Sequence, residues 1–181
     1  MLRASSKLEQ GAGEYIDGAS GRGTGQNDRR REELVLKEVR TRTASARWIG
    51  GFLVFVHGAE PPADSEWEEL LSLFRMATEE GQTSLRVLVY SEGGAPNARQ
   101  RAQLNEVLAG IKPRVAVLTP SATARAVGVA ISWFNPDLRV FSGDELGRGL
   151  DHLDVNHGER RILTHALTEL RAQKKSSYPP G

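Results

Sequence analysis

The chain has 181 residues, of which 39% are hydrophobic and 26% charged, a balance typical of a globular protein built on one ordinary domain. The formal net charge is +1, so no overall field favours nucleic acid or an acidic membrane as a partner. There are no cysteines, which excludes disulfides, thiolate catalysis and cysteine-ligated zinc, and which suits a reducing cytoplasm. The longest apolar runs, such as "FLVFV" from Phe52 to Val56, are too short to span a bilayer. We therefore expect a cytoplasmic protein without a membrane or nucleic-acid partner.

The two ends of the chain differ in composition from its middle. The segment 1–32 contains "GAGEYIDGASGRGTGQNDRRR", which is rich in glycine, serine and charge, and it is predicted to be disordered because it has few apolar anchors. The segment 174–181, "KKSSYPPG", contains two prolines and no periodicity, and is predicted to be a flexible tail. Between these ends we predict a domain at 33–155 and a C-terminal helix at 156–173.

The first part of the domain indicates three strands and a helix. "LVLKEVRTR" contains a strand near Val35 to Thr41, and "ARWIGGFLVFVH" contains two strands around a turn at Gly50-Gly51. The later strand is apolar on both faces, so it should be central in a sheet. "DSEWEELLSLFRMA" predicts a helix with a capping box formed by Ser65 and Glu68. Its buried stripe would consist of Trp67, Leu70, Leu71 and Phe74.

Strands and helices then alternate. Further strands are predicted at Leu85 to Tyr90, Arg114 to Thr119 and Leu138 to Phe141. Helices are predicted after the capping pairs Asn97 and Gln100, Ser142 and Glu145, and Asn156 and Glu159, and within "PSATARAVGVAISWF", which stops at Asn135-Pro136. The helix after Asn97 carries the inward stripe Leu104, Val107, Leu108 and Ile111. This alternation predicts an α/β fold: a mostly parallel sheet with an antiparallel N-terminal hairpin, helices packed on the sheet, and an extra C-terminal helix.

From about Leu34 to Val155 the pattern resembles STAS domains of the SpoIIAA-like, anti-sigma-factor-antagonist type. The resemblance rests on the early hairpin and on three strand-to-helix segments, "RVLVYSEGGAPNARQRAQLNEVL", "RVAVLTPSATARAVGVAISWFNP" and "LRVFSGDELGRGLDHL". It covers about two thirds of the chain and consists of element lengths and apolar positions. The family implies a SpoIIAA-like fold and a non-enzymatic role.

Typical members of that family bind a partner kinase or anti-sigma factor and release it when a serine is phosphorylated. That serine lies at the N-terminus of the helix after a central strand, and the equivalent place here, Gly94 to Asn97, contains no serine or threonine. Ser91 lies earlier, at the end of the strand, and is the only hydroxyl of the turn "SEGGAPN". The resemblance therefore implies that a phosphate switch, if present, acts through Ser91.

Two other functions are compatible with the same turn. Gly93-Gly94 before a helix could present backbone N–H groups to an anion, which would make the protein a small-molecule or nucleotide sensor, although "SEGGAPN" matches no phosphate-binding motif. His57 and Ser91 could lie at the same edge of a parallel sheet and act in a hydrolase, although Val89 stands where a nucleophile elbow needs glycine. The spacing of His152, His157 and His165 is not typical of a metal site, and we expect neither a metal nor a cofactor.

We favour a protein-interaction surface at this turn. Arg99 and Arg101 stand in the first helical turns, where the helix dipole disfavours cations, and such a violation of a local rule is a hint of function. Trp133, beside the Asn135-Pro136 stop, is a second candidate because an exposed tryptophan suits an interface. The predicted partner-binding residues are Ser91, Gly93, Gly94, Asn97, Arg99 and Arg101.

Overall fold

The computed structural model describes residues 35–79, 84–122 and 137–176. These ranges contain one six-stranded sheet whose strands follow one another in chain order across the sheet. The first three strands are antiparallel neighbours, and the third to the sixth are parallel. The strands are β1 (Val35–Arg40), β2 (Ala44–Ile49), β3 (Phe52–His57), β4 (Arg86–Ser91), β5 (Arg114–Thr119) and β6 (Leu138–Ser142). The predicted α/β class, parallel sheet and leading hairpin are confirmed at this level.

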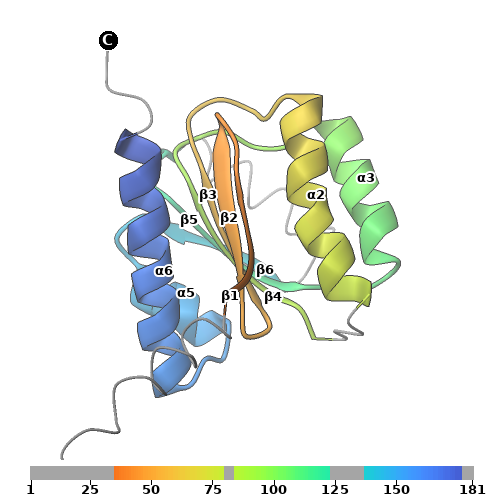
Figure 1. Ribbon diagram of the computed structural model, residues 1–181. Helices are drawn as coiled ribbons and strands as arrows, with labels where there is room; N and C mark the ends of the chain where they lie inside the picture. The colour runs from red at the N-terminus through yellow and green to blue at the C-terminus, as the bar shows by residue number, and fades with distance from the viewer. Residues whose placement is uncertain (1–34, 80–83, 123–136, 177–181) are drawn as a thin grey trace, which may run out of the picture.

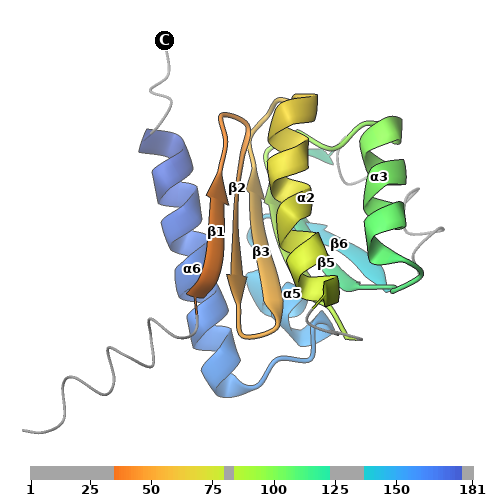
Figure 2. The same ribbon diagram turned by 45° about the vertical axis from the view of Figure 1, so that its right-hand side comes forward.

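Helices cover both faces of the sheet (Figures 1 and 2). One face carries α2 (Asp64–Glu79) and α3 (Ala98–Leu108), and the other carries α5 (Leu146–His152) and α6 (His157–Ser176). The prediction that 1–32 is disordered, and the predicted helix carrying Trp133 and Phe134, fall outside the described residues.

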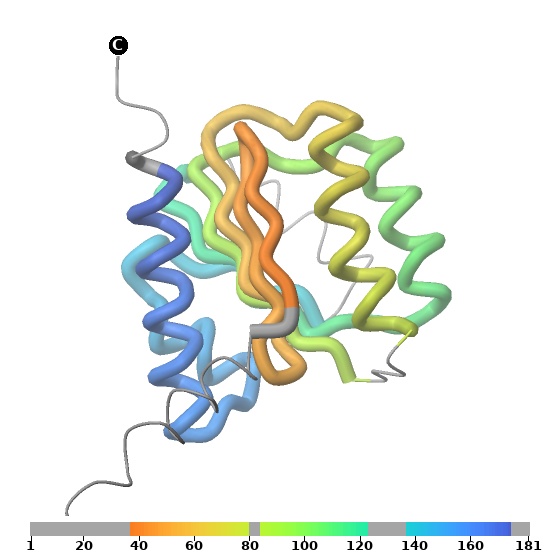
Figure 3. The backbone as a smooth tube through the Cα atoms, viewed as in Figure 1, coloured from red at the N-terminus to blue at the C-terminus, as the bar shows by residue number. Residues whose placement is uncertain are grey.

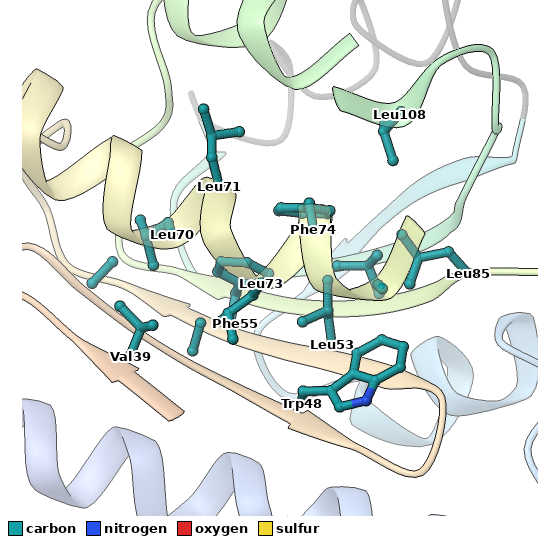
Figure 4. Close-up of a cluster of buried hydrophobic side chains, with 14 of the residues drawn as sticks. Val39, Trp48, Leu53, Phe55, Leu70, Leu71, Leu73, Phe74, Leu85 and Leu108 are labelled. Carbon is teal, nitrogen blue, oxygen red and sulfur yellow. The ribbon is translucent and has the colours of Figure 1, made fainter. Parts of the chain in front are cut away.

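The central strand β3 separates two hydrophobic cores. Leu53 and Phe55 point toward α2, where they meet Leu70 and Phe74 (Figure 4). Val54 and Val56 belong to the opposite core, which is closed by α5 and α6. Every residue of β3 is buried, so the prediction of a central strand is confirmed. The turn before it uses Gly50 and Gly51 at φ angles of 52° and 87°, which glycine adopts without strain.

Three predicted helix boundaries need correction. Ser65 is the second residue of α2 rather than its cap, because Ala63 precedes the helix and its N–H donates to the Glu66 carboxylate at 2.9 Å. Residues 142–145 form a turn and α5 begins only at Leu146. The last helix continues to Ser176 instead of ending at 173, so the first residues of the predicted tail are helical. The stripe of α2 is confirmed, and both capping boxes that begin with asparagine form as predicted.

A buried arginine fixes α6 to the sheet. Arg47 on β2 donates to Glu38 at 2.6 Å and to Glu169 of α6 at 2.7 Å. Burial alone would lower the pKa of Arg47, but the hydrogen bonds to both carboxylates outweigh it and raise that pKa. The bond from Arg47 likewise lowers the pKa of Glu169. None of the helices within the described ranges has the length and apolarity needed to cross a membrane.

The two-sided core makes a direct stability prediction. Leu88 lies in the middle of β4 with no exposed surface, so Leu88→Ala leaves a cavity and should lower the free energy of unfolding by about 2–5 kcal/mol. Ile162, on the outer side of α6, is 39% exposed, and Ile162→Ala should change the free energy of unfolding by less than about 0.5 kcal/mol. Urea denaturation of both variants provides the comparison, and equal effects would contradict the assigned layers.

Candidate functional site

The carboxyl ends of the parallel strands meet at one edge of the sheet, as the sequence predicted. His57 is the register partner of Ser91, and Thr119 pairs with Ser142 on the next strand. His57, Ser91 and Thr119 are all buried. The connection from β3 to α2 and the one from β4 to α3 both pass over this edge (Figure 3).

These two connections are packed directly onto one another. The Gly94 N–H donates to the Gly58 carbonyl at 2.9 Å, and the Glu92 N–H donates to the His57 carbonyl at 3.1 Å. A Cβ on Gly94 would lie only 2.2 Å from the Glu60 carbonyl oxygen. Gly94 is therefore glycine because another backbone occupies that space, whereas Gly93 is exposed and has a φ of 137°.

The Ser91 hydroxyl closes the turn that follows β4. It donates to the Gly94 carbonyl at 2.7 Å and accepts from the Gly93 N–H at 3.1 Å. A hydroxyl has only one proton to donate, so Ser91 cannot donate it to His57 at the same time. The structure brings Ser91 and His57 side by side in register but does not join them as nucleophile and base.

His57 is a neutral buried ring. Burial, followed by the charge of Lys174, lowers the pKa of His57 to about 4. Its Nδ1 has no hydrogen-bond partner within the part of the chain that the structure describes, and its ring stacks on Phe55 with centroids 5.9 Å apart. A side chain in this state contributes to packing and is a weak base at neutral pH.

Gln100 connects the two loops and was expected only as a capping residue. Its backbone N–H donates to Asn97 Oδ1 and its Oε1 accepts from the Asn97 N–H, both at 3.0 Å. Its Nε2 donates to the Pro62 carbonyl at 2.9 Å and to Asp64 Oδ1 at 3.1 Å. The side chain has no exposed surface. Its burial could have been expected from the sequence, because Gln100 stands four residues before Leu104 and so lies on the inward stripe of α3.

The backbone of Gln100 also receives a bond from the neighbouring helix. Trp67 on α2 donates its indole N–H to the Gln100 carbonyl at 3.0 Å. This contact is buried and ties α2 to the first turn of α3. The start of α3 is thereby held from both its side chain and its main chain.

The two arginines of α3 have local partners. Arg99 Nη1 lies 3.4 Å from Asp64 Oδ2 in the acidic first turn of α2. Arg101 donates to the Pro96 carbonyl at 2.7 Å. The Arg99 side chain is 75% exposed, so this pair is weak and the guanidinium group remains accessible.

Two further side chains at this edge were not identified from the sequence. Glu66 accepts from the Thr43 N–H and hydroxyl, each at 3.0 Å, which ties the β1–β2 connection to α2. Burial alone would raise the pKa of Glu66, but its hydrogen bonds with Ala63 and Thr43 outweigh it and lower that pKa. Lys174 of α6 lies beside Gly58, and burial lowers its pKa. The sequence predicts a flexible tail from residue 174, whereas Lys174 lies in α6.

Within the described residues, no group of three or more His, Asp or Glu side chains is arranged to hold a metal ion. The conformation of this edge is instead set by hydrogen bonds of Ser91, Gln100 and Glu66. Comparisons with protein-family models, with curated proteins and with solved structures find no match to this chain.

The contact between the two connections can be tested at its closest point. Gly94→Ala forces the new Cβ onto the Glu60 carbonyl and should lower the free energy of unfolding by about 1–3 kcal/mol or more. Gly147→Ala in α5 meets nothing within 4 Å and should be neutral or stabilising by up to about 1 kcal/mol. Thermal and urea melts provide the readout. A Gly94→Ala protein as stable as wild type would contradict the packing.

The buried His57 makes stability depend on pH. Its pKa in the folded state is about 4, below the ordinary 6.5, so its stabilising effect is complete above about pH 6.5 and is lost as the pH falls toward 4. We expect the unfolding free energy to fall by about 2 kcal/mol more in wild type than in His57→Phe between about pH 7 and about pH 5. Urea denaturation at both pH values measures this difference. If the unfolding free energies of wild type and His57→Phe changed equally with pH, the lowered pKa of His57 would be contradicted.

Proposed function

We propose that this chain is a non-enzymatic regulatory interaction module of STAS, SpoIIAA-like type, which binds a protein partner through the turn and first helical residues from Ser91 to Arg101. The observation that carries the proposal is an exposed turn held from below by the hydrogen bonds of Ser91 and Gln100. Gly93, Asn97 and Arg99 are exposed, whereas Ser91 and Gln100 beneath them are buried. The mixed sheet with helices on both faces is compatible with a STAS-type fold.

A rigid turn is well suited to binding a protein. Ordering a loop on association reduces the affinity that its contacts could otherwise provide, and that loss is smaller when the free protein already holds the bound conformation. The turn from 92 to 97 is fixed by the Ser91 hydroxyl on one side and by the capping box of Gln100 on the other. A partner would therefore meet a preorganised surface.

The charges around the turn favour a partner with both signs of charge. Arg99 is exposed beside Asp64, and Glu60 with its partner Arg42 lies on the adjacent connection. All four side chains are at least half exposed, so they form a polar rim. Rim charges mainly steer association and select partners.

The geometry argues against the two alternatives. A hydrolase would need the Ser91 proton to reach His57, but that proton is donated to Gly94 and the His57 pKa of about 4 makes it a poor base. An anion site would need free backbone N–H groups. Those of Gly93 and Gly94 are already bonded to the Ser91 hydroxyl and the Gly58 carbonyl.

The buried position of Ser91 also defines how a phosphate on it would act. A phosphorylated Ser91 could not keep its bond to the Gly94 carbonyl, because the donated proton would be lost. The modification would therefore open the turn rather than add a charge to an intact surface, and it would require a transient opening before the kinase could reach the hydroxyl.

A charge-reversal pair tests the proposed surface. Arg99→Glu with Arg101→Glu changes two exposed side chains, so the melting curve should stay close to that of wild type. Lys112→Glu with Arg161→Glu is the matched control, since it makes the same change in net charge at exposed positions outside the turn. Affinity capture followed by mass spectrometry should yield a protein retained by wild type and by the control, but lost with the Arg99 and Arg101 pair. Retention of every captured protein by all three would contradict the proposal.

A further inference from the structure

A hollow lies between β6 and α5, away from the turn that runs from Ser91 to Arg101. It has a volume of about 300 Å³, at the lower end of the range for small-molecule sites. Its lining residues are Arg139, Phe141, Arg148, Asp151 and His152. None of them belongs to the turn from Ser91 to Arg101, so the hollow is independent of the function proposed above.

The fold builds the apolar floor of this hollow. Arg139 and Phe141 are two residues apart on β6, so their side chains project to the same face of the sheet. Gly149 lets α5 lie close to that face, since a Cβ there would come within 3.3 Å of Leu118 and 3.8 Å of Phe141. Phe141 is 8% exposed and forms the floor, and the His152 ring lies beside it with centroids 6.1 Å apart.

The charges in the hollow are balanced except for one. Arg148 is paired with Glu145, and Asp151 is paired with Arg160. His152 Nε2 contacts the Asp137 carbonyl at 2.9 Å. Arg139 is exposed, and its side chain forms no ion pair or hydrogen bond within the part of the chain that the structure describes. The hollow therefore presents one uncompensated guanidinium group beside an aromatic floor.

We propose that this hollow binds a small aromatic carboxylate. A guanidinium group binds a carboxylate through two parallel hydrogen bonds, which is the pairing that Arg139 has available. The ligand ring would lie against Phe141, because aromatic rings prefer offset or edge contacts with one another. Arg148 stands at the rim with its guanidinium carbon 5.7 Å from the Phe141 centroid, and its side chain is 69% exposed, so it can cover the ring from the solvent side.

Titration of the full chain with sodium benzoate, followed by two-dimensional ¹H–¹⁵N NMR, tests this site. We expect saturable shifts of the amide signals of β6 and α5. Arg139→Gln should weaken binding by about tenfold or more, because it removes a charge-assisted pair. Arg161→Gln makes the same charge change on the exposed side of α6 and should bind like wild type. The spectra report directly that both variants are folded.

Benzamide separates the ion pair from simple ring stacking, since it keeps the ring and lacks the negative charge. Benzamide should bind wild type at least about tenfold more weakly than benzoate does. The two compounds should bind Arg139→Gln with about equal affinity. Three results would each overturn the proposal. They are the absence of benzoate shifts on β6 and α5, equal affinity of wild type and Arg139→Gln for benzoate, and equal affinity of benzoate and benzamide for wild type.

Discussion

The side-chain amide of Gln100 holds together the two connections on which the carboxyl edge of the sheet depends. Its oxygen accepts from Asn97 and its nitrogen donates to Pro62 and Asp64, so it links the start of α3 to the start of α2. A buried amide without these partners would be strongly destabilising, because removing a polar group from water costs about 1–3 kcal/mol unless its hydrogen bonds are replaced. The observed conformation of the two connections supplies hydrogen-bond partners for the buried amide.

Several contacts follow from this arrangement. With α2 and α3 held by Gln100, the connection after β3 lies across Gly94, where only glycine leaves room for the Glu60 carbonyl. Ser91 then closes the turn beneath it. The result is a polar rim on a rigid base, with the potential nucleophile and the neutral His57 both engaged in structure. These contacts support the proposed role of the edge in recognition.

The elements that depend on hydrophobic periodicity could be predicted from the sequence. The contacts between segments that are distant in the chain could not. Alternation of strands and amphipathic helices was enough to predict the parallel sheet, the central β3 and the edge shared by His57 and Ser91. The place of Gln100 on the inward stripe of α3 indicates that it is buried, but its partners Pro62 and Asp64 are 38 and 36 residues away, so no local pattern identifies them. Lys174 was not identified because its neighbours in the sequence are polar, whereas in the fold its side chain packs beside Gly58. The prediction of Ser65 as the helix cap was wrong, because the Ala63 N–H donates to the Glu66 carboxylate and α2 begins before Ser65.

Amide hydrogen exchange of the turn tests its rigidity most directly. The N–H groups of Glu92 and Gly94 donate to the His57 and Gly58 carbonyls, so both should exchange much more slowly than in an unstructured peptide. Protection approaching that of the β4 amides is the result that a preorganised surface predicts. Exchange of Glu92 and Gly94 at unstructured rates, with β4 still protected, would show that the turn is mobile in the free protein and would contradict the claim.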